Sequence, residues 1–378
     1  MYSFGHGVQL DYAEAMRWLE KAADQGHAMA QFGLGNMFLN GQGVPQDIVR
    51  AYAWFSLSEL LARSMTLAQK TKAERLAREW KSRKQSGATP SEFMIGDLDS
   101  ALAAFRGGDY ATAIQLFRQF AERGNPSAQF YLGFMYANAR GVPKNYAEAL
   151  KWYRLAADQG FASAQHNLGF MYANGWGVEQ DHVEAVKWYR LASNQGFSGA
   201  QNELGYDYLQ GRGVPRNYDE ALKWFRLAAD RGNAGAQTNL GNMYAQGLGV
   251  PQDYVEAVKW YRLAADQGNA GARKNLGDRY GNGQGVAKDY VEAAKWWQLA
   301  AEQGHAGAQN NLGTLYAEGQ GVTQDNVSAY LWFSLAAAQG DKGAINNLDR
   351  VAHHMSQAQI LEAKKLVSEW QPKKSQTD

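Results

Sequence analysis

A ten-residue segment, KWYRLAADQG, occurs twice in this chain, at 151–160 and again at 259–268. Near-copies begin at 187, 223 and 295, so the true spacing is 36 residues. Leu-Gly pairs keep the same period from 132 to 312, and tryptophans keep it from 152 to 332. A fixed period of this length is typical of a solenoid, in which each structural unit packs mainly on its neighbours.

The first half of each unit predicts a helix with one apolar face. In the unit at 235–268, Ala236, Leu240 and Tyr244 recur four residues apart, which places them on one stripe. Gly241 lies inside this helix, where a glycine costs about 1 kcal/mol relative to alanine. Its recurrence predicts that a neighbouring backbone or indole approaches too closely for a Cβ. Gly247 then suits the left-handed residue that ends a helix.

The second half of the unit predicts a second helix, antiparallel to the first. Asp253 followed by Glu256 has the spacing of a capping box, and the same signature recurs in other units. The apolar face of this helix is predicted to comprise Ala257, Trp260, Tyr261, Ala264 and Ala265. One pair cannot cover its own apolar face, so neighbouring pairs must stack. The predicted fold class is therefore all-α.

The unit as a whole resembles the Sel-one-like repeat (SLR) family, which is related to the tetratricopeptide repeats. The shared pattern, A-x-x-x-L-G-x-x-Y followed by G-x-G-V and A-x-x-W-x-x-x-A-A-x-x-G, covers most of the chain. The resemblance implies a right-handed α/α superhelix with a concave groove. It also implies an adaptor or regulatory role, often in bacteria, and some bacterial relatives have been linked to penicillin binding.

Two breaks in the pattern predict the domain organisation. Segments 65–80 and 355–370 both look like closing helices, with capping boxes at Thr66/Gln69 and Ser356/Gln359. We predict a short array over 1–84, a linker over 85–94 and a tetratricopeptide-like starting pair over 95–125. Six units then follow over 126–340, with capping helices over 341–371 and a disordered tail over 372–378.

The chain begins inside a repeat, because Met1-Tyr2 aligns with Met171-Tyr172 within a first helix. A fragment or truncated gene would explain this start, as would an end that pairs with a second molecule, including another copy. The opening residues have neither the basic start nor the apolar core of a signal peptide. We therefore expect a periplasmic or secreted location if a leader lies upstream, and a cytoplasmic one otherwise.

Composition and motifs argue against several functions. Lys plus Arg total 38 and Asp plus Glu total 37, a balance that disfavours nucleic acid or an anionic membrane as partner. There is no cysteine, and no Ser-x-x-Lys, Gly-x-Ser-x-Gly or His-Glu-x-x-His motif. The adjacent His353 and His354 do not share a helical face. We expect no catalytic residue, metal site or cofactor, and so no enzyme.

Candidate partner-binding residues lie on the first helices, which line the concave side in tetratricopeptide-like arrays. The residue before Leu-Gly is usually asparagine, whose amide can bind the backbone of an extended peptide. An ordinary solvated helix face is the alternative. The residues that directly precede Leu-Gly are Tyr131 in the first unit, followed by Asn167, Glu203, Asn239, Asn275 and Asn311.

The residue after Leu-Gly changes character along the chain. It is aromatic in three consecutive units and polar in the next three: Phe134, Phe170, Tyr206, Asn242, Asp278 and Thr314. An aromatic strip beside a polar one is the expected pattern of a binding hot spot. The alternative is that these rings pack against the preceding unit. This pattern predicts a protein-interaction scaffold that holds a peptide or partner protein in its groove. The resemblance to the SLR family implies the alternative, a protein that binds or hydrolyses a β-lactam or cell-wall fragment.

Overall fold

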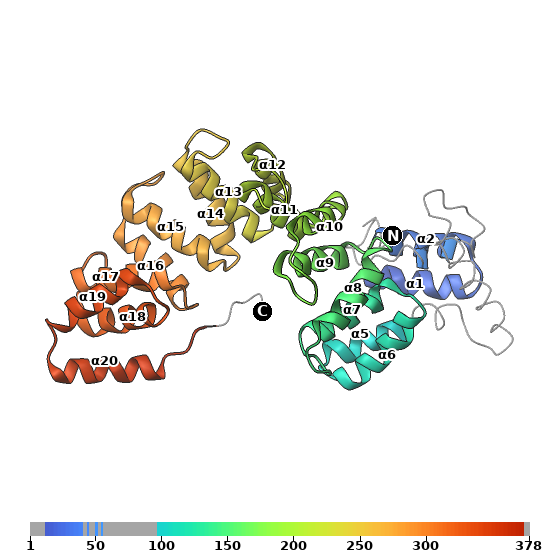
Figure 1. The fold of residues 1–378 in the computed structure, drawn as a ribbon, viewed down its shortest axis with the longest axis horizontal. Coiled ribbons are helices and arrows are strands. Elements are labelled where there is room, and N and C mark those ends of the chain that lie inside the picture. The colour runs from blue at the N-terminus through green and yellow to red at the C-terminus, as the bar shows by residue number, and fades with distance from the viewer. Residues whose placement is uncertain (1–11, 41–43, 45–49, 52–53, 56–96, 374–378) are drawn as a thin grey trace. The chain divides into compact units, whose positions relative to one another are not determined.

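The computed structural model describes residues 12–40, 44, 50–51, 54–55 and 97–373. Its regular elements are all helices, and no described residue lies in a strand (Figure 1). The chain divides into two compact units, Met1–Phe197 (unit 1) and Ser198–Asp378 (unit 2).

The helices follow one another as antiparallel pairs. In unit 1 they are α1 (Tyr12–Asp24), α2 (Ala28–Asn40), α5 (Asp97–Arg106), α6 (Tyr110–Glu122), α7 (Pro126–Ala137), α8 (Tyr146–Ala157), α9 (Ala162–Asn174) and α10 (His182–Asn194). In unit 2 they are α11 (Ser198–Gln210), α12 (Tyr218–Ala229), α13 (Ala234–Gln246), α14 (Tyr254–Asp266), α15 (Ala270–Asn282), α16 (Tyr290–Ala301), α17 (Ala306–Glu318), α18 (Asn326–Ala338), α19 (Lys342–Ala352) and α20 (Gln357–Glu369). This order confirms the predicted all-α solenoid of helix pairs.

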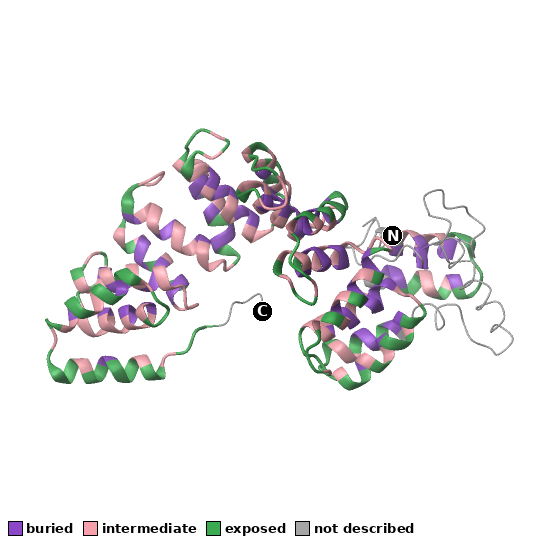
Figure 2. Ribbon diagram, in the orientation of Figure 1, coloured by how far each residue is buried: buried purple, intermediate pink, exposed green. Residues whose placement is uncertain are grey.

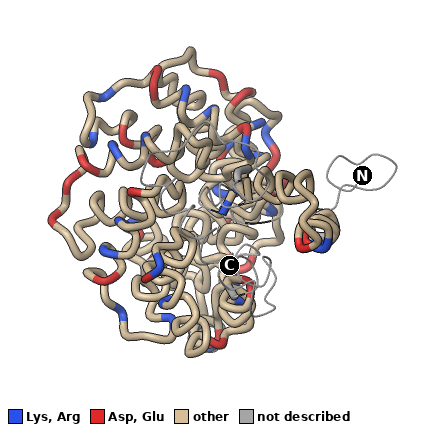
Figure 3. Tube along the Cα trace, turned by 90° about the vertical axis from the view of Figure 1, so that its right-hand side faces the viewer, with Lys and Arg blue, Asp and Glu red and all other residues tan. Residues whose placement is uncertain are grey.

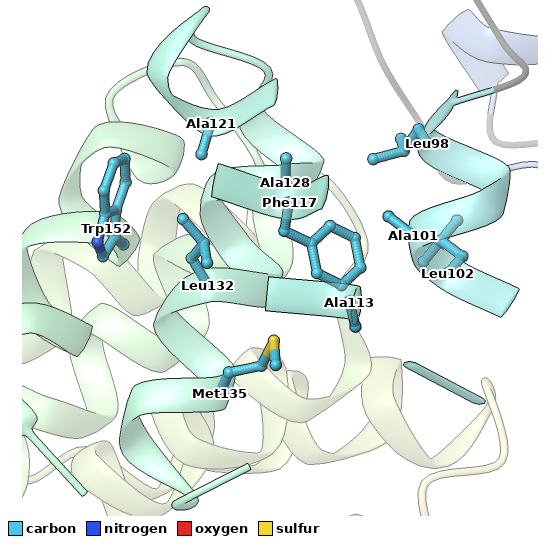
Figure 4. Close-up of a cluster of buried hydrophobic side chains, with 10 residues drawn as sticks. All are labelled: Leu98, Ala101, Leu102, Ala113, Phe117, Ala121, Ala128, Leu132, Met135 and Trp152. Atoms are coloured by element: carbon cyan, nitrogen blue, oxygen red, sulfur yellow. The ribbon is translucent and has the colours of Figure 1, made fainter. Parts of the chain in front are cut away.

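The core of the array lies between consecutive helices (Figure 2). Over α5–α10 in unit 1 and over α11–α19 in unit 2, each helix packs on the next one along the chain, and α20 packs back on α18. Figure 4 shows one such cluster, in which Leu98 of α5 and Phe117 of α6 join Leu132 of α7 and Trp152 of α8. The helix pair α5–α6, joined by a turn at Gly107–Asp109, therefore extends the core of the pairs that follow it.

The glycine inside each first helix makes room for an aromatic ring, as predicted, but the ring is rarely an indole. A methyl group on Gly241 would lie 2.6 Å from the nearest ring carbon of Tyr261. Tyrosine or phenylalanine fills the same place in the other described pairs, except that the glycine of α15, Gly277, lies against the indole of Trp297. The glycine thus allows the two helices of a pair to approach closely.

The prediction that Trp260 belongs to the buried face of its helix was wrong in part. Tyr261 is buried, whereas Trp260 is half-buried, and Val258 takes the remaining core position. The ring that fills the space above Gly241 is that of Tyr261, so the tryptophan next to it lies at the edge of the core.

The predicted glycine cap at the end of α13 is confirmed, whereas the predicted capping box at the start of α14 forms only in part. Gly247 ends α13 in the left-handed conformation. Asp253 caps α14, accepting from the backbone N–H groups of Val255 and Glu256 at 2.9 and 3.0 Å. The reciprocal half of the capping box is absent here, because the N–H of Asp253 already donates to the Tyr244 carbonyl. Glu256 instead pairs with Lys259 at 2.8 Å.

A full capping box does form at Ser356 and Gln359, at the start of α20. Its predicted counterpart at Thr66/Gln69 lies outside the described residues, as do the first closing helix and the 85–94 linker. The division of the chain into two arrays therefore stays a prediction. Near the start, Ala15 of α1 is buried whereas Trp18 is 55% exposed, and self-association through this end also stays a prediction.

Candidate functional site

In unit 2 the asparagines before the last three Leu-Gly pairs are half-buried, and each donates a hydrogen bond to the preceding first helix. We call this set of bonds the asparagine ladder. It joins Asn239 Nδ2 to Asn202 Oδ1 at 3.0 Å, Asn275 Nδ2 to Asn242 Oδ1 at 3.0 Å, and Asn311 Nδ2 to Asp278 Oδ1 at 3.1 Å. The fold thus has its own use for the recurring asparagine, which the sequence interpretation had not assigned. One N–H of each donating amide is occupied in this way, and each amide has two.

The ladder is also tied to the second helices. The Tyr261 hydroxyl donates to Asn242 Oδ1 at 2.7 Å. The Trp297 indole donates to Asp278 Oδ1 at 3.1 Å, and Lys274 donates to Asp278 Oδ2 at 2.7 Å. Burial raises the pKa of Tyr261, which keeps this hydroxyl protonated as a donor. The polar residues after Leu-Gly, Asn242 and Asp278, are therefore held in fixed orientations.

In unit 1 the residues directly before Leu-Gly make other contacts than the asparagine ladder of unit 2. Tyr131 stacks on Phe117 with ring centroids 4.9 Å apart, so it belongs to the core rather than to an open face. Asn167 contacts His166, with 3.1 Å between Asn167 Oδ1 and His166 Nδ1. Desolvation by burial lowers the pKa of His166, although the hydrogen bond with Asn167 opposes this.

The aromatic residues after Leu-Gly differ in exposure. Phe134 meets Phe105 edge to face at 5.8 Å and packs on the core, as the alternative interpretation expected. Phe170 is 36% exposed. Tyr206 lies under the guanidinium of Arg212, 4.4 Å from its ring centroid. Because Phe134 and Phe170 belong to unit 1 and Tyr206 to unit 2, a continuous strip of the three stays a prediction.

Phe170 belongs to a group of surface rings that the sequence reasoning missed, which we call the aromatic cluster. Its ring meets Trp176 edge to face at 5.2 Å, and Trp176 stacks on Tyr146 at 5.0 Å. Trp176 is itself 38% exposed. The sequence does contain a signal, because the loops at this position read GQGV, ARGV, GWGV, GRGV or GLGV and only one holds an aromatic residue.

Acidic side chains lie beside Tyr206 on α11. Asp207 is only 3% exposed at a position where neighbouring pairs carry Met171 and Met243. Arg212 Nε lies 3.6 Å from Asp207 Oδ1, and Asn202 donates to Glu203 at 3.2 Å. Desolvation raises the pKa of Asp207 to about 7, with Arg212 opposing the shift and Glu203 adding to it. Desolvation likewise raises the pKa of Glu203.

Other kinds of site find no support in the part of the chain that the structure describes. No group of three or more His, Cys, Asp or Glu side chains there could hold a metal ion. No helix among those residues is long and apolar enough to cross a membrane. Acidic and basic residues are interspersed along the described trace (Figure 3). His353 and His354 are exposed at the end of α19.

An all-α array of stacked helix pairs, joined by side-chain ladders and carrying aromatic residues on its surface, defines a solenoid repeat protein. The profile of the Sel1 repeat family matches residues 1–27, 28–59, 96–125, 126–161, 162–197, 198–233, 234–269, 270–305 and 306–341. The chain belongs to the Sel1 repeat family. The profile includes 96–125, which the sequence reasoning had described as tetratricopeptide-like. Sel1 repeat proteins are generally non-catalytic scaffolds for protein interaction.

Similar proteins come from bacteria and from a mammal. A Sel1 repeat protein from Oxalobacter formigenes is 35% identical, with a TM-score of 0.60 over 64% of this chain and 96% of that one. A protective antigen of uropathogenic Escherichia coli with an SLR fold is 30% identical over 98% of this chain and 89% of that one, with a TM-score of 0.49. DAP3-binding cell death enhancer 1 of Rattus norvegicus is 35% identical over 151 residues. The match covers 36% of this chain and 28% of that protein.

Proposed function

We propose that this chain is a non-enzymatic scaffold that binds an extended peptide or a partner protein on the face formed by its first helices. The observation that carries the proposal is the aromatic cluster, in which Phe170 and Trp176 are each more than a third exposed and touch each other. Membership of the Sel1 repeat family, whose solenoids typically serve in protein interaction, supports the same conclusion.

The aromatic cluster has the physical properties of a binding anchor. Tryptophan and tyrosine are enriched at hot spots because a rigid ring buries much apolar area at little entropic cost. Covering the exposed parts of two rings stabilises a complex by roughly 2–3 kcal/mol. The stacking of Trp176 on Tyr146 holds the indole in place before a partner arrives, which lowers the cost of ordering it on binding.

The asparagine ladder of unit 2 would contribute specificity rather than an apolar anchor. Its amides are fixed by bonds between helices, so the remaining N–H groups and oxygens keep constant positions along the array. A peptide backbone offers matching donors and acceptors at regular intervals. The proposed contact residues are those predicted from the sequence, among which Phe134 also packs on the core: Phe134, Phe170, Tyr206, Asn167, Glu203, Asn239, Asn242, Asn275, Asp278 and Asn311.

The double variant F170S/W176S tests the proposal. Because both rings are partly exposed, it should keep the helicity and melting temperature of the wild type. Binding to the main partner that the wild type recovers by affinity capture should weaken at least about thirtyfold, as expected for removal of a hot spot. V183S is the matched control, since Val183 is a 54% exposed apolar residue outside the cluster. Unchanged binding by F170S/W176S would show that the cluster is not the anchor.

A further inference from the structure

The chain carries one extended segment bound across its own helices, at the C-terminal end of the described residues. We call Trp370–Lys373 the C-terminal strap. After α20 ends at Glu369, the Trp370 ring meets the edge of Trp332 on α18, with centroids 6.5 Å apart. Lys373 then reaches the end of α16. Its backbone N–H donates to the Glu302 carbonyl at 2.7 Å, and its Nζ donates to Glu302 Oε2 at 2.8 Å.

The surface under the strap has the features of a peptide acceptor. The carbonyl of Glu302, the C-cap of α16, is one of the groups that a helix leaves without an internal partner, and the strap N–H satisfies it. The carboxylate is held by Gln298, whose Nε2 donates to Glu302 Oε1 at 2.9 Å. A cation is favoured at this end of a helix. Gly304, over which Trp370 and Pro372 lie, has no side chain to obstruct the approach.

The contacts of the strap are few, so a competing segment has little to displace. Residues 371–373 are exposed, Trp370 is half-buried, and Ala363 is the one buried residue of α20. Figure 2 shows α20 as mostly exposed. An element with so little buried apolar surface opens at low free-energy cost.

The sequence motif of the strap occurs a second time in the chain. Trp80-x-x-Arg83 repeats the order of Trp370-x-x-Lys373, a tryptophan followed by a base three residues later. Trp80 and Arg83 lie outside the described residues, so the likeness concerns sequence alone. The acceptor residues Glu302, Gly304 and Trp332 occupy general repeat positions, since Asp266, Gly268 and Trp296 have the same order and spacing. The strap motif is therefore the part of the contact that selects a tryptophan followed by a base.

We propose that Glu302, Gly304 and Trp332 form a docking site for an extended partner segment in which a tryptophan precedes a lysine or arginine by three positions. The strap fills the site within the chain, and a partner segment of the same chemistry binds by displacing it. The site is formed by the end of α16 and the middle of α18 and shares no residue with the aromatic cluster, so it does not depend on the proposed function.

The test is binding of a fluorescent peptide, LVSEWQPKKSQ, to the full chain by anisotropy. In the W370A/K373A variant the site is vacant, and this variant should bind the peptide at least about tenfold more tightly than the wild type. Adding E302Q to that variant should weaken binding about tenfold, because one charge-assisted hydrogen bond is lost. Adding D266N instead removes the corresponding carboxylate one repeat earlier and should change nothing.

Equal peptide binding by the wild type and W370A/K373A would overturn the proposal, as would equal effects of E302Q and D266N. If W370A/K373A has a lower melting temperature, the K373E variant decides. It changes a surface residue whose loss leaves the core intact, and it should also bind the peptide more tightly than the wild type. A peptide with alanine in place of its tryptophan must fail to bind, or the docking site does not recognise the proposed chemistry.

Discussion

Asp207 shows how one residue can depart from the pattern of an otherwise regular array. Neighbouring pairs place methionine there, where an unbranched apolar side chain fills the core. The carboxylate of Asp207 has an arginine 3.6 Å away, yet its Oδ2 atom has no hydrogen-bond partner. A buried carboxylate with an incomplete set of partners destabilises the fold whenever it is charged.

The variant D207M should therefore be more stable than the wild type, by an amount that depends on pH. The pKa of Asp207 is raised from 3.8 to about 7, so the folded state binds a proton more readily than the unfolded state. Wild-type stability consequently falls as the pH rises from about 4 to 7. We expect D207M to stabilise by on the order of 2–4 kcal/mol at pH 8 and by much less at pH 5.

Thermal melting of both proteins at the two pH values measures this difference. D207N keeps the shape of the side chain but cannot ionise. The difference in stability between D207M and D207N should therefore not depend on pH, although D207N lacks the packing of a methionine. A stabilisation that is the same at pH 5 and pH 8 would mean that the charge of Asp207 is not its cause.

At the scale of the helices, a buried glutamine joins three consecutive elements. Gln237 of α13 is 4% exposed and donates to the Ala229 carbonyl at the end of α12, at 3.2 Å. It accepts from Gln267, at the end of α14, at 2.7 Å. In the next pair Arg273 occupies the same position, and its Nε donates to the Ala265 carbonyl at 3.1 Å. The position therefore requires a donor rather than glutamine itself.

Replacing Gln237 tests this requirement. Q237L keeps the approximate volume but leaves the Ala229 carbonyl without its side-chain donor, so we expect a loss of about 1–3 kcal/mol. Q237R should recover much of that loss, because an arginine meets the same need at Arg273. Chemical denaturation of the three proteins gives the comparison. Equal loss in Q237L and Q237R would show that packing, not the hydrogen bond, governs the position.

The helix pairs and their boundaries could be predicted because they depend on local signals. The 36-residue period, the Asx residues at the N-caps and the left-handed glycines are all visible in the sequence. Periodicity does not decide between Trp260 and Tyr261, since adjacent aromatic residues both fit a helical apolar face. The choice depends on which ring faces Gly241, and that is set by how closely two helices pack.

The candidate site was predictable only in part, for a related reason. The asparagine ladder joins residues 33 or 37 positions apart, so its bonds depend on the offset between stacked pairs. Trp176 lies in a loop, where no helical period marks the direction of a side chain. Phe170, by contrast, was found by comparing equivalent positions of the repeats, which identifies the places that the shared fold leaves free to vary.

At the scale of the array, equivalent residues of successive pairs bond back to the preceding pair, although the position of the acceptor differs between pairs. Asn239 reaches Asn202 of the preceding pair, and Asn275 occupies the equivalent place one repeat later. Arg273 corresponds in the same way to Gln237. If residues 234–269 were absent, Ala270 would follow Asn233, so Asn275 would face Asn202 and Arg273 would face the Ala229 carbonyl. The repeat that begins at Ala270 would then form the interface that the deleted repeat forms with its preceding neighbour.

Deletion of residues 234–269 should therefore give a folded protein. Because stability in a solenoid is close to a sum over units and their interfaces, we expect unchanged helicity per residue and a modest decrease in melting temperature. Deletion of 252–269 alone is the control, since it removes α14 and leaves the apolar face of α13 uncovered. That variant should lose helicity or aggregate. If circular dichroism showed the two deletions to be equally damaging, the 36-residue pair would not be the unit that the array adds or loses.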